Sequence, residues 1–115
     1  QQYRVLDVYP GSPGDLILCK LSVASSFLAT DFEALSYVWG EGTAVEPLLV
    51  NGCSMKVTQN LHKALQSLRH RTEPRILWVD AICIDQSNVD EKNVQVAMMG
   101  DIYRAAKTVC VFLGE

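Results

Sequence analysis

Two short apolar runs with a long helical pattern between them dominate the C-terminal third of the chain. The first run, residues 76–79, ends at Asp80, and the second, residues 108–113, ends at Gly114 and Glu115. Two β-type runs joined by one helix are typical of a βαβ unit, whose strands are parallel and whose crossover is almost always right-handed. We therefore expect Asp80 and Glu115 at the same carboxyl edge of a sheet, where open α/β sheets bind ligands.

The segment between the two runs has the signals of a helix. Ser87 and Asp90 fit the S-x-x-D capping signature, in which the serine hydroxyl accepts a free backbone N–H. Gln95 is expected on the helix surface, and Gly100 costs about 1 kcal/mol relative to alanine. For Gly100 we favour close approach by another backbone over a tolerated weakness. Apolar residues recur every four positions and predict the buried stripe: Val94, Met98, Ile102 and Ala106.

The first half of the chain predicts mainly β-structure. Residues 3–9 and 16–23 read as strands on either side of the turn-rich segment 10–15, which predicts an antiparallel hairpin. Asn51-Gly52 between two apolar runs predicts a second hairpin through a type I′ turn. Thr58 is a good N-cap for a helix, whose apolar stripe is Leu61, Ala64, Leu65 and Leu68.

A third β-type run, residues 33–39, ends at Gly40-Glu41-Gly42. If this strand is parallel to the two C-terminal strands, three strand ends meet at one edge of a sheet. These signals predict an α/β fold with a mostly parallel sheet flanked by helices and with added N-terminal and internal β-hairpins. We expect one domain, residues 1–115, in which residues 1–32 form a lead-in hairpin and loop and residues 33–115 carry the core motifs.

That sheet edge would gather the carboxylates of Glu41, Asp80, Asp85 and Glu115. Crowded carboxylates repel one another, which raises the pKa of one of them and suits acid–base work or stabilisation of a cationic transition state. Glu41 and Asp80 are the candidate catalytic residues, because both follow strand ends. The alternatives are a plain turn around Glu41, hydrogen bonding of Asp80 to the following loop, and solvation of Asp85 and Glu115. The candidate ligand-binding residues at the same edge are Ser36, Tyr37, Trp39, Gly40, Cys83 and Gln86.

The charge and apolar composition of the chain limit the classes of function that we expect. Ten Lys and Arg against thirteen Asp and Glu give a net charge of −3, with no basic stripe, so nucleic-acid binding has little electrostatic support. No apolar run approaches the length of a membrane span. The start of the chain lacks the apolar core of a signal peptide. It also lacks an initiator methionine, so we expect a piece of a longer protein.

The four cysteines lack metal-site spacing. None forms a C-x-x-C pair and there are only two His, so no metal site is predicted. We interpret all four as reduced thiols of an intracellular, cytoplasmic protein, with disulfides in a secreted domain as the minority alternative. Cys83 would need a general base to act as a nucleophile, and no motif brings a histidine to it. His62 and His70 are both expected as solvated surface residues.

Three ordered blocks resemble a known family, the fungal heterokaryon-incompatibility (HET) domain. Residues 34–40, ALSYVWG, resemble its A-L-S-Y-x-W-G opening, and residues 77–86, LWVDAICIDQ, resemble its block L-W-I-D-A-x-C-I-N-Q. Asp85 stands where the family usually has Asn, and Phe112 where Trp is common. The third block, E-K-x-x-Q-V-x-x-M-x-x-I-Y-x-x-A-x-x-V, is matched by Glu91-Lys92, Gln95-Val96, Met99, Ile102-Tyr103, Ala106 and Val109.

The resemblance implies a cell-death domain that acts in non-self recognition when genetically unlike fungal cells fuse. The family is also remotely similar to Toll/interleukin-receptor (TIR) domains, which implies a flavodoxin/TIR-like sheet and two modes of action. One is signalling by self-association or by docking to other signalling domains. The other is hydrolysis of NAD, a substrate rather than a bound cofactor, with release of nicotinamide. TIR-type hydrolases carry their glutamate on a later helix, so such a helix would lie beyond residue 115.

Overall fold

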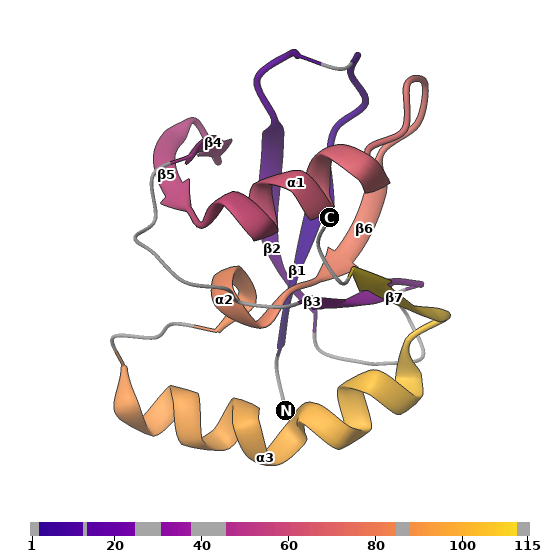
Figure 1. Cartoon of the computed structure of the whole chain (residues 1–115). Coiled ribbons are helices and arrows are strands. Elements are labelled where there is room, and N and C mark those ends of the chain that lie inside the picture. Colours follow the sequence, from indigo (N-terminus) through magenta and orange to yellow (C-terminus); the bar gives the residue numbers. More distant parts are fainter. Residues whose placement is uncertain (1–2, 13, 25–30, 38–45, 85–87, 113–115) are drawn as a thin grey trace.

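One seven-stranded sheet contains the described strands, in the order β5-β4-β2-β1-β6-β3-β7 (Figure 1). The structure is a computed structural model that describes residues 3–12, 14–24, 31–37, 46–84 and 88–112. The strands are β1 (Tyr3–Val8), β2 (Leu18–Ala24), β3 (Glu33–Tyr37), β4 (Glu46–Val50), β5 (Cys53–Val57), β6 (Arg75–Trp78) and β7 (Thr108–Phe112). The helices are α1 (Gln59–Leu68), α2 (Asp80–Cys83) and α3 (Val89–Ala105).

The three strands expected to be parallel are parallel. β3 lies between β6 and β7 and pairs with both in parallel register. Successive residues of a strand point to opposite faces of a sheet. Ala34 and Leu35 of β3 are both buried, as are Leu77 and Trp78 of β6, so these two strands are covered on both faces. The βαβ pattern of the C-terminal third is therefore confirmed.

The N-terminal hairpin is confirmed, but it is part of the main sheet. β1 and β2 pair antiparallel, from Tyr3 opposite Ala24 to Val8 opposite Cys19. β1 also pairs antiparallel with β6, so the segment expected as a lead-in supplies the strand between β2 and β6. The described pairs are half parallel and half antiparallel. The sheet is thus mixed rather than mostly parallel.

The second hairpin has the predicted turn. β4 and β5 pair antiparallel, and Asn51 and Gly52 between them have φ values of 53° and 80°, as a type I′ turn requires. The Asn51 side chain accepts a hydrogen bond from the Leu21 N–H (2.9 Å) and donates one to the Leu21 carbonyl (3.3 Å). The turn therefore also ties this hairpin to β2.

Helix α1 follows its prediction closely. The Thr58 hydroxyl accepts a hydrogen bond from the Leu61 N–H, and Leu61, Ala64 and Leu65 are buried. His62 is mostly buried rather than solvated, with its ring nitrogen 3.8 Å from the Glu46 carboxylate. His70 is exposed, as expected.

Helix α3 departs from its prediction at its start and in its buried face. Asn88 is the N-cap and accepts a hydrogen bond from the Glu91 N–H, one position after the expected cap; Ser87 lies outside the described residues. The buried residues are Gln95, Met98 and Ile102, whereas Val94 is exposed. Met98 and Ile102 of the predicted stripe are therefore buried as expected, and Ala106 is partly buried, but at the start of the helix Gln95 takes the buried position in place of Val94.

Among the residues that the structure describes, no neighbouring backbone approaches Gly100 closely. A Cβ atom at Gly100 would meet the Arg104 side chain at 3.5 Å, an ordinary contact with a flexible group. The glycine is therefore a tolerated weakness in the helix, contrary to our expectation. No helix in the described part of the chain is long and apolar enough to cross a membrane.

Candidate functional site

A small pocket lies at the carboxyl ends of β3 and β6. Its walls include Leu35, Ser36 and Tyr37 of β3, Asp80 directly after β6, and Tyr103 of α3, and its volume is about 60 Å³. Three of the predicted site residues, Ser36, Tyr37 and Asp80, therefore meet at the predicted edge. Tyr103 is the addition, because it was not among the candidate site residues that the sequence indicated. It packs edge-on against Trp78, with ring centroids 5.7 Å apart.

Helix α2 places Asp80 at the strand end. Val79 is its N-cap, and the Val79 carbonyl accepts hydrogen bonds from the N–H groups of Ile82 and Cys83. This single turn begins two residues after the last residue of β6. Asp80, its first residue, is half-buried and lies beside the end of β3.

The pocket keeps its two phenols protonated. Burial, followed by the charges of Asp80 and Tyr103, raises the pKa of the Tyr37 phenol well above its usual range. Burial and the Asp80 charge also raise the pKa of Tyr103. A protonated phenol can donate a hydrogen bond and accept one. The site therefore offers two phenol groups and a carboxylate to a polar ligand.

Cys83 lies in the core and does not line this pocket. Its side chain is fully buried, and its Sγ accepts a hydrogen bond from the Val79 N–H at 3.4 Å. Burial raises the pKa of the Cys83 thiol to about 12. A thiol that stays protonated at neutral pH is a poor nucleophile, so the structure argues against thiol catalysis at Cys83.

The other predicted site residues lie outside the described residues. These are Trp39, Gly40, Glu41, Asp85, Gln86 and Glu115. Their roles, including the crowding of carboxylates around Asp80, stay predictions.

A second pocket, which sequence reasoning missed, lies between β1, β2 and α3. It encloses about 80 Å³, and its walls include Arg4, Val23, Glu91 and Gln95. Arg4 makes a two-point ion pair with Glu91, with one contact at 2.6 Å, and donates to the Cys83 carbonyl at 3.0 Å. Gln95 is buried here rather than on the surface.

The spacing of two polar residues on the helix could have indicated this pocket from the sequence. Glu91 and Gln95 are four residues apart and so share one face of a helix. Because Glu91 binds Arg4, this face lies toward the sheet at the start of the helix, where Gln95 is buried and Val94 is exposed. The ion pair thus gives a physical reason why Gln95 replaces Val94 in the buried face.

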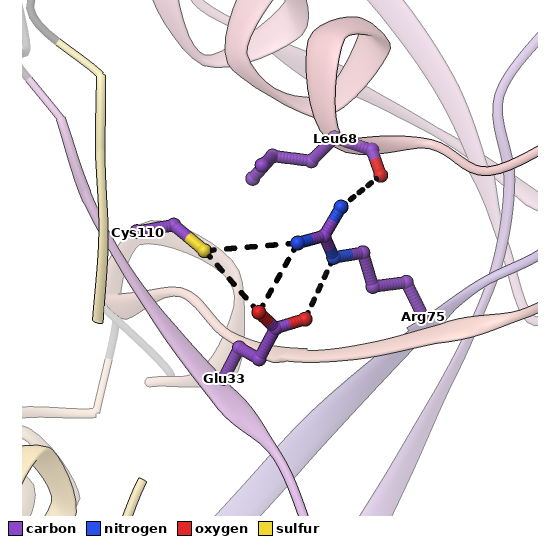
Figure 2. Close-up of polar contacts among 4 residues, drawn as sticks. All are labelled: Glu33, Leu68, Arg75 and Cys110. Atoms are coloured by element: carbon purple, nitrogen blue, oxygen red, sulfur yellow. Dashed lines mark hydrogen bonds and ion pairs between the residues drawn. The ribbon is translucent and has the colours of Figure 1, made fainter. Parts of the chain in front are cut away.

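A polar cluster occupies the opposite, amino-terminal ends of β3 and β6 (Figure 2). Arg75 donates to both carboxylate oxygens of Glu33, at 2.7 and 3.1 Å, and to the Leu68 carbonyl at 2.8 Å. The Cys110 thiol lies 3.5 Å from Glu33. An open hollow of about 230 Å³ adjoins this cluster, with His70 and Lys107 also in its wall. Among the described residues, no group of three His, Cys, Asp or Glu side chains could hold a metal ion.

Comparison with known proteins decides the family. The family model described as "Heterokaryon incompatibility protein (HET)" matches residues 32–115. The chain belongs to the HET family. It is 35% identical over 125 aligned residues to heterokaryon incompatibility protein 6, OR allele, of Neurospora crassa. No solved structure matches this chain.

The HET chain is much shorter than this relative. The alignment covers 96% of the chain but 18% of the Neurospora protein. The pocket residues Ser36, Tyr37, Asp80 and Tyr103 all lie inside the part that the family model matches. Arg4, which holds Glu91 of α3, lies outside that part.

Proposed function

We propose that this HET domain is a signalling module of heterokaryon incompatibility, which promotes cell death in non-self recognition by self-association or partner docking. The match to the HET family over residues 32–115 and the name of the Neurospora relative support this role. The four cysteines are free thiols, which supports action in the cytoplasm.

Exposed valines on two elements carry the proposal of docking. On α3, Val89, Val94 and Val96 are all exposed, and on β7 Val109 and Val111 are exposed. Scattered apolar side chains are normal on a surface, but these five come from a helix and the strand that follows it. Apolar side chains that water contacts in the free domain favour association, because burial in an interface removes that contact.

Induced proximity tests this function directly. The domain, expressed in the cytoplasm of a fungal cell as a fusion to a drug-inducible dimerisation module, should kill the cell when the drug is added. The dimerisation module alone with the drug, and the fusion without it, are the controls. Full viability with folded, dimerised fusion protein would refute signalling by proximity.

A second candidate function, NAD hydrolysis in a TIR-like manner, is favoured by the Asp80 pocket. In this reaction the bond between the ribose and the nicotinamide nitrogen breaks, water adds to the ribose carbon, and nicotinamide and a proton leave. Asp80 would stabilise the oxocarbenium-like ribose, and the phenols of Tyr37 and Tyr103 would bind ribose hydroxyls. The pocket of about 60 Å³ is smaller than the roughly 300–1,000 Å³ of ordinary ligand sites, so this function ranks second.

Nicotinamide release distinguishes the two functions. Purified domain and the longer parent protein are each incubated with NAD, and nicotinamide is measured by chromatography. Turnover that the Asp80→Asn variant loses would support hydrolysis. No release by the folded parent protein would exclude it.

A further inference from the structure

Arg4 of β1 forms a bridge between the end of α2 and the start of α3. One of its terminal nitrogens donates to the Cys83 carbonyl at 3.0 Å and to the Glu91 carboxylate at 2.6 Å. The other terminal nitrogen donates to the second carboxylate oxygen of Glu91. The side chains of Arg4 and Glu91 are 29% and 24% exposed. Because a two-point ion pair fixes the plane of a guanidinium, Glu91 also fixes the direction in which Arg4 meets Cys83.

Helix α2 receives this bond at its last residue and carries Asp80 at its first. The helix is a single turn of four residues, Asp80–Cys83, and it lies against β1 (Figure 1). Three residues of helix span about 4.5 Å, so the two ends of the turn move together. Val79 supplies no side-chain cap at the first end. At the second end, the last carbonyls of a helix lack partners within it, and Arg4 supplies one for Cys83.

The apolar contacts of α2 do not by themselves fix its orientation. Ile82 and Cys83 are buried and hold the turn against the core. Burial of apolar groups is non-directional, whereas a hydrogen bond weakens steeply as its angle departs from linear. A directional bond at the end of so short a helix therefore restricts its rotation more than the buried side chains do.

We propose that Arg4 is a positioning residue for the candidate site, which acts through the α2 turn and sets where the Asp80 carboxylate lies relative to the two phenols. Arg4 is not among the described walls of that pocket, and it lies outside residues 32–115, which the family model matches. The pocket has a volume of about 60 Å³, so a displacement of the carboxylate by about 0.5 Å changes the site. This inference rests on the second candidate function, because that function gives the pocket a ligand.

Ionisation of the two phenols measures the position of Asp80. The Asp80 charge raises the pKa of Tyr37 and of Tyr103. Arg4→Met should let the α2 turn rotate away, so that the ionisation constants of both phenols increase at least about threefold. Loss of the Arg4 charge through space acts in the opposite direction, because a nearby cation favours the phenolate. A fall in both pKa values therefore distinguishes a displaced Asp80 from the simple loss of a positive charge.

Fluorine NMR measures each phenol separately. Fluorotyrosine is introduced in place of Tyr37 or Tyr103, and its resonance is followed during an alkaline titration. The fluorine substituent lowers the pKa of the phenol, which brings the titration closer to the range where the protein is folded. Arg104→Met is the matched control, since Arg104 is a cation of α3 whose ion pair with Asp101 is mostly exposed. This control should lower neither pKa.

A second background shows whether Arg4 acts through Asp80. In Asp80→Asn protein, Arg4→Met should change the phenol titrations little, because the charge that it displaces is absent. Glu91→Gln weakens the hold on Arg4 and should shift both titrations in the same direction as Arg4→Met, by a smaller factor. This milder variant carries the test if Arg4→Met does not fold. Thermal unfolding shows which variants are folded.

Unchanged or raised phenol pKa values in a folded Arg4→Met variant would overturn the inference. An equal fall in the Asp80→Asn background would also overturn it, because Arg4 would then act on the phenols by another route. Nicotinamide release by the parent protein together with unshifted phenols would keep the hydrolysis and reject the positioning role. A fall in both pKa values without any nicotinamide release would keep the positioning role and reject the hydrolysis.

Discussion

Arg75 and Glu33, the first residues of the neighbouring parallel strands β6 and β3, form a two-point ion pair at the amino edge of the sheet (Figure 2). Both side chains are about four-fifths shielded from solvent. Arg75 also donates to the Leu68 carbonyl at the end of α1, so one guanidinium joins β3, β6 and α1. This pair fixes the ends of the strands whose other ends form the Asp80 pocket.

We expect Glu33→Gln to lower the free energy of unfolding by about 1–3 kcal/mol, because the partly buried Arg75 then loses an ionised partner. Urea denaturation measures the change. Asp101→Asn is the matched control, since Asp101 and Arg104 form an ion pair that is mostly exposed. Exposed pairs contribute little, so the control should stay within about 0.5 kcal/mol of the parent. Equal effects of the two substitutions would contradict the prediction.

The same pair predicts a loss of stability in acid. The hydrogen bond from Arg75 lowers the pKa of Glu33 below its usual value of 4.5, despite partial burial. The unfolded chain therefore takes up this proton at higher pH than the folded chain, and the contribution is complete above about pH 5 and falls as the pH drops through the folded pKa. Unfolding free energies measured as a function of pH should fall less steeply in acid for Glu33→Gln. Parallel curves for parent and variant would refute this role.

Asp80→Asn should lower the pKa values of both Tyr37 and Tyr103. The Asp80 charge disfavours the phenolate form of each residue, so its removal makes both phenols easier to ionise. Phenolate absorbance during an alkaline titration measures the change. Tyr37→Phe and Tyr103→Phe in the Asp80→Asn background assign each shift, and an unchanged titration would show that Asp80 does not act on the phenols.

The four thiols should react with iodoacetamide in an order set by burial. Cys53 is exposed and should react first, and the half-buried Cys110 should follow. Burial raises the pKa of Cys19 to about 11 and that of Cys83 to about 12, so both should react only on unfolding. Mass spectrometry of tryptic peptides gives the order. Rapid alkylation of Cys83 in the folded protein would instead support Cys83 as a catalytic nucleophile.

Gly100→Ala should stabilise the protein by about 0.5–1 kcal/mol. The position lies inside α3 and is exposed, and the contact at 3.5 Å is with the flexible Arg104 side chain. The midpoint of urea denaturation should rise with an unchanged slope. A lower midpoint would indicate the close backbone approach that the sequence suggested and the structure lacks.

Local patterns in the sequence predicted individual elements well. The Asn51-Gly52 turn, the Thr58 cap and the parallel strands around β3 each follow from a few neighbouring residues. The predictions that were wrong concern features that depend on contacts between residues far apart in the sequence. The pairing of β1 with β6 joins residues about seventy positions apart, and the ion pair of Arg4 with Glu91 accompanies the burial of Gln95 in place of Val94 at the start of α3.

By itself, the sequence determined the two longer helices, the hairpins, the family and three of the residues that meet in the pocket, because capping, turn chemistry and motifs act over short spans of chain. Only the tertiary structure decided that β1 lies inside the sheet, that Tyr103 lines the Asp80 pocket and that Cys83 is buried in the core. These outcomes depend on which distant strands pair and which helix face packs. Several pairings and helix rotations fit the same local pattern, and the packed core together with the ion pairs of Arg4 and Arg75 selects among them.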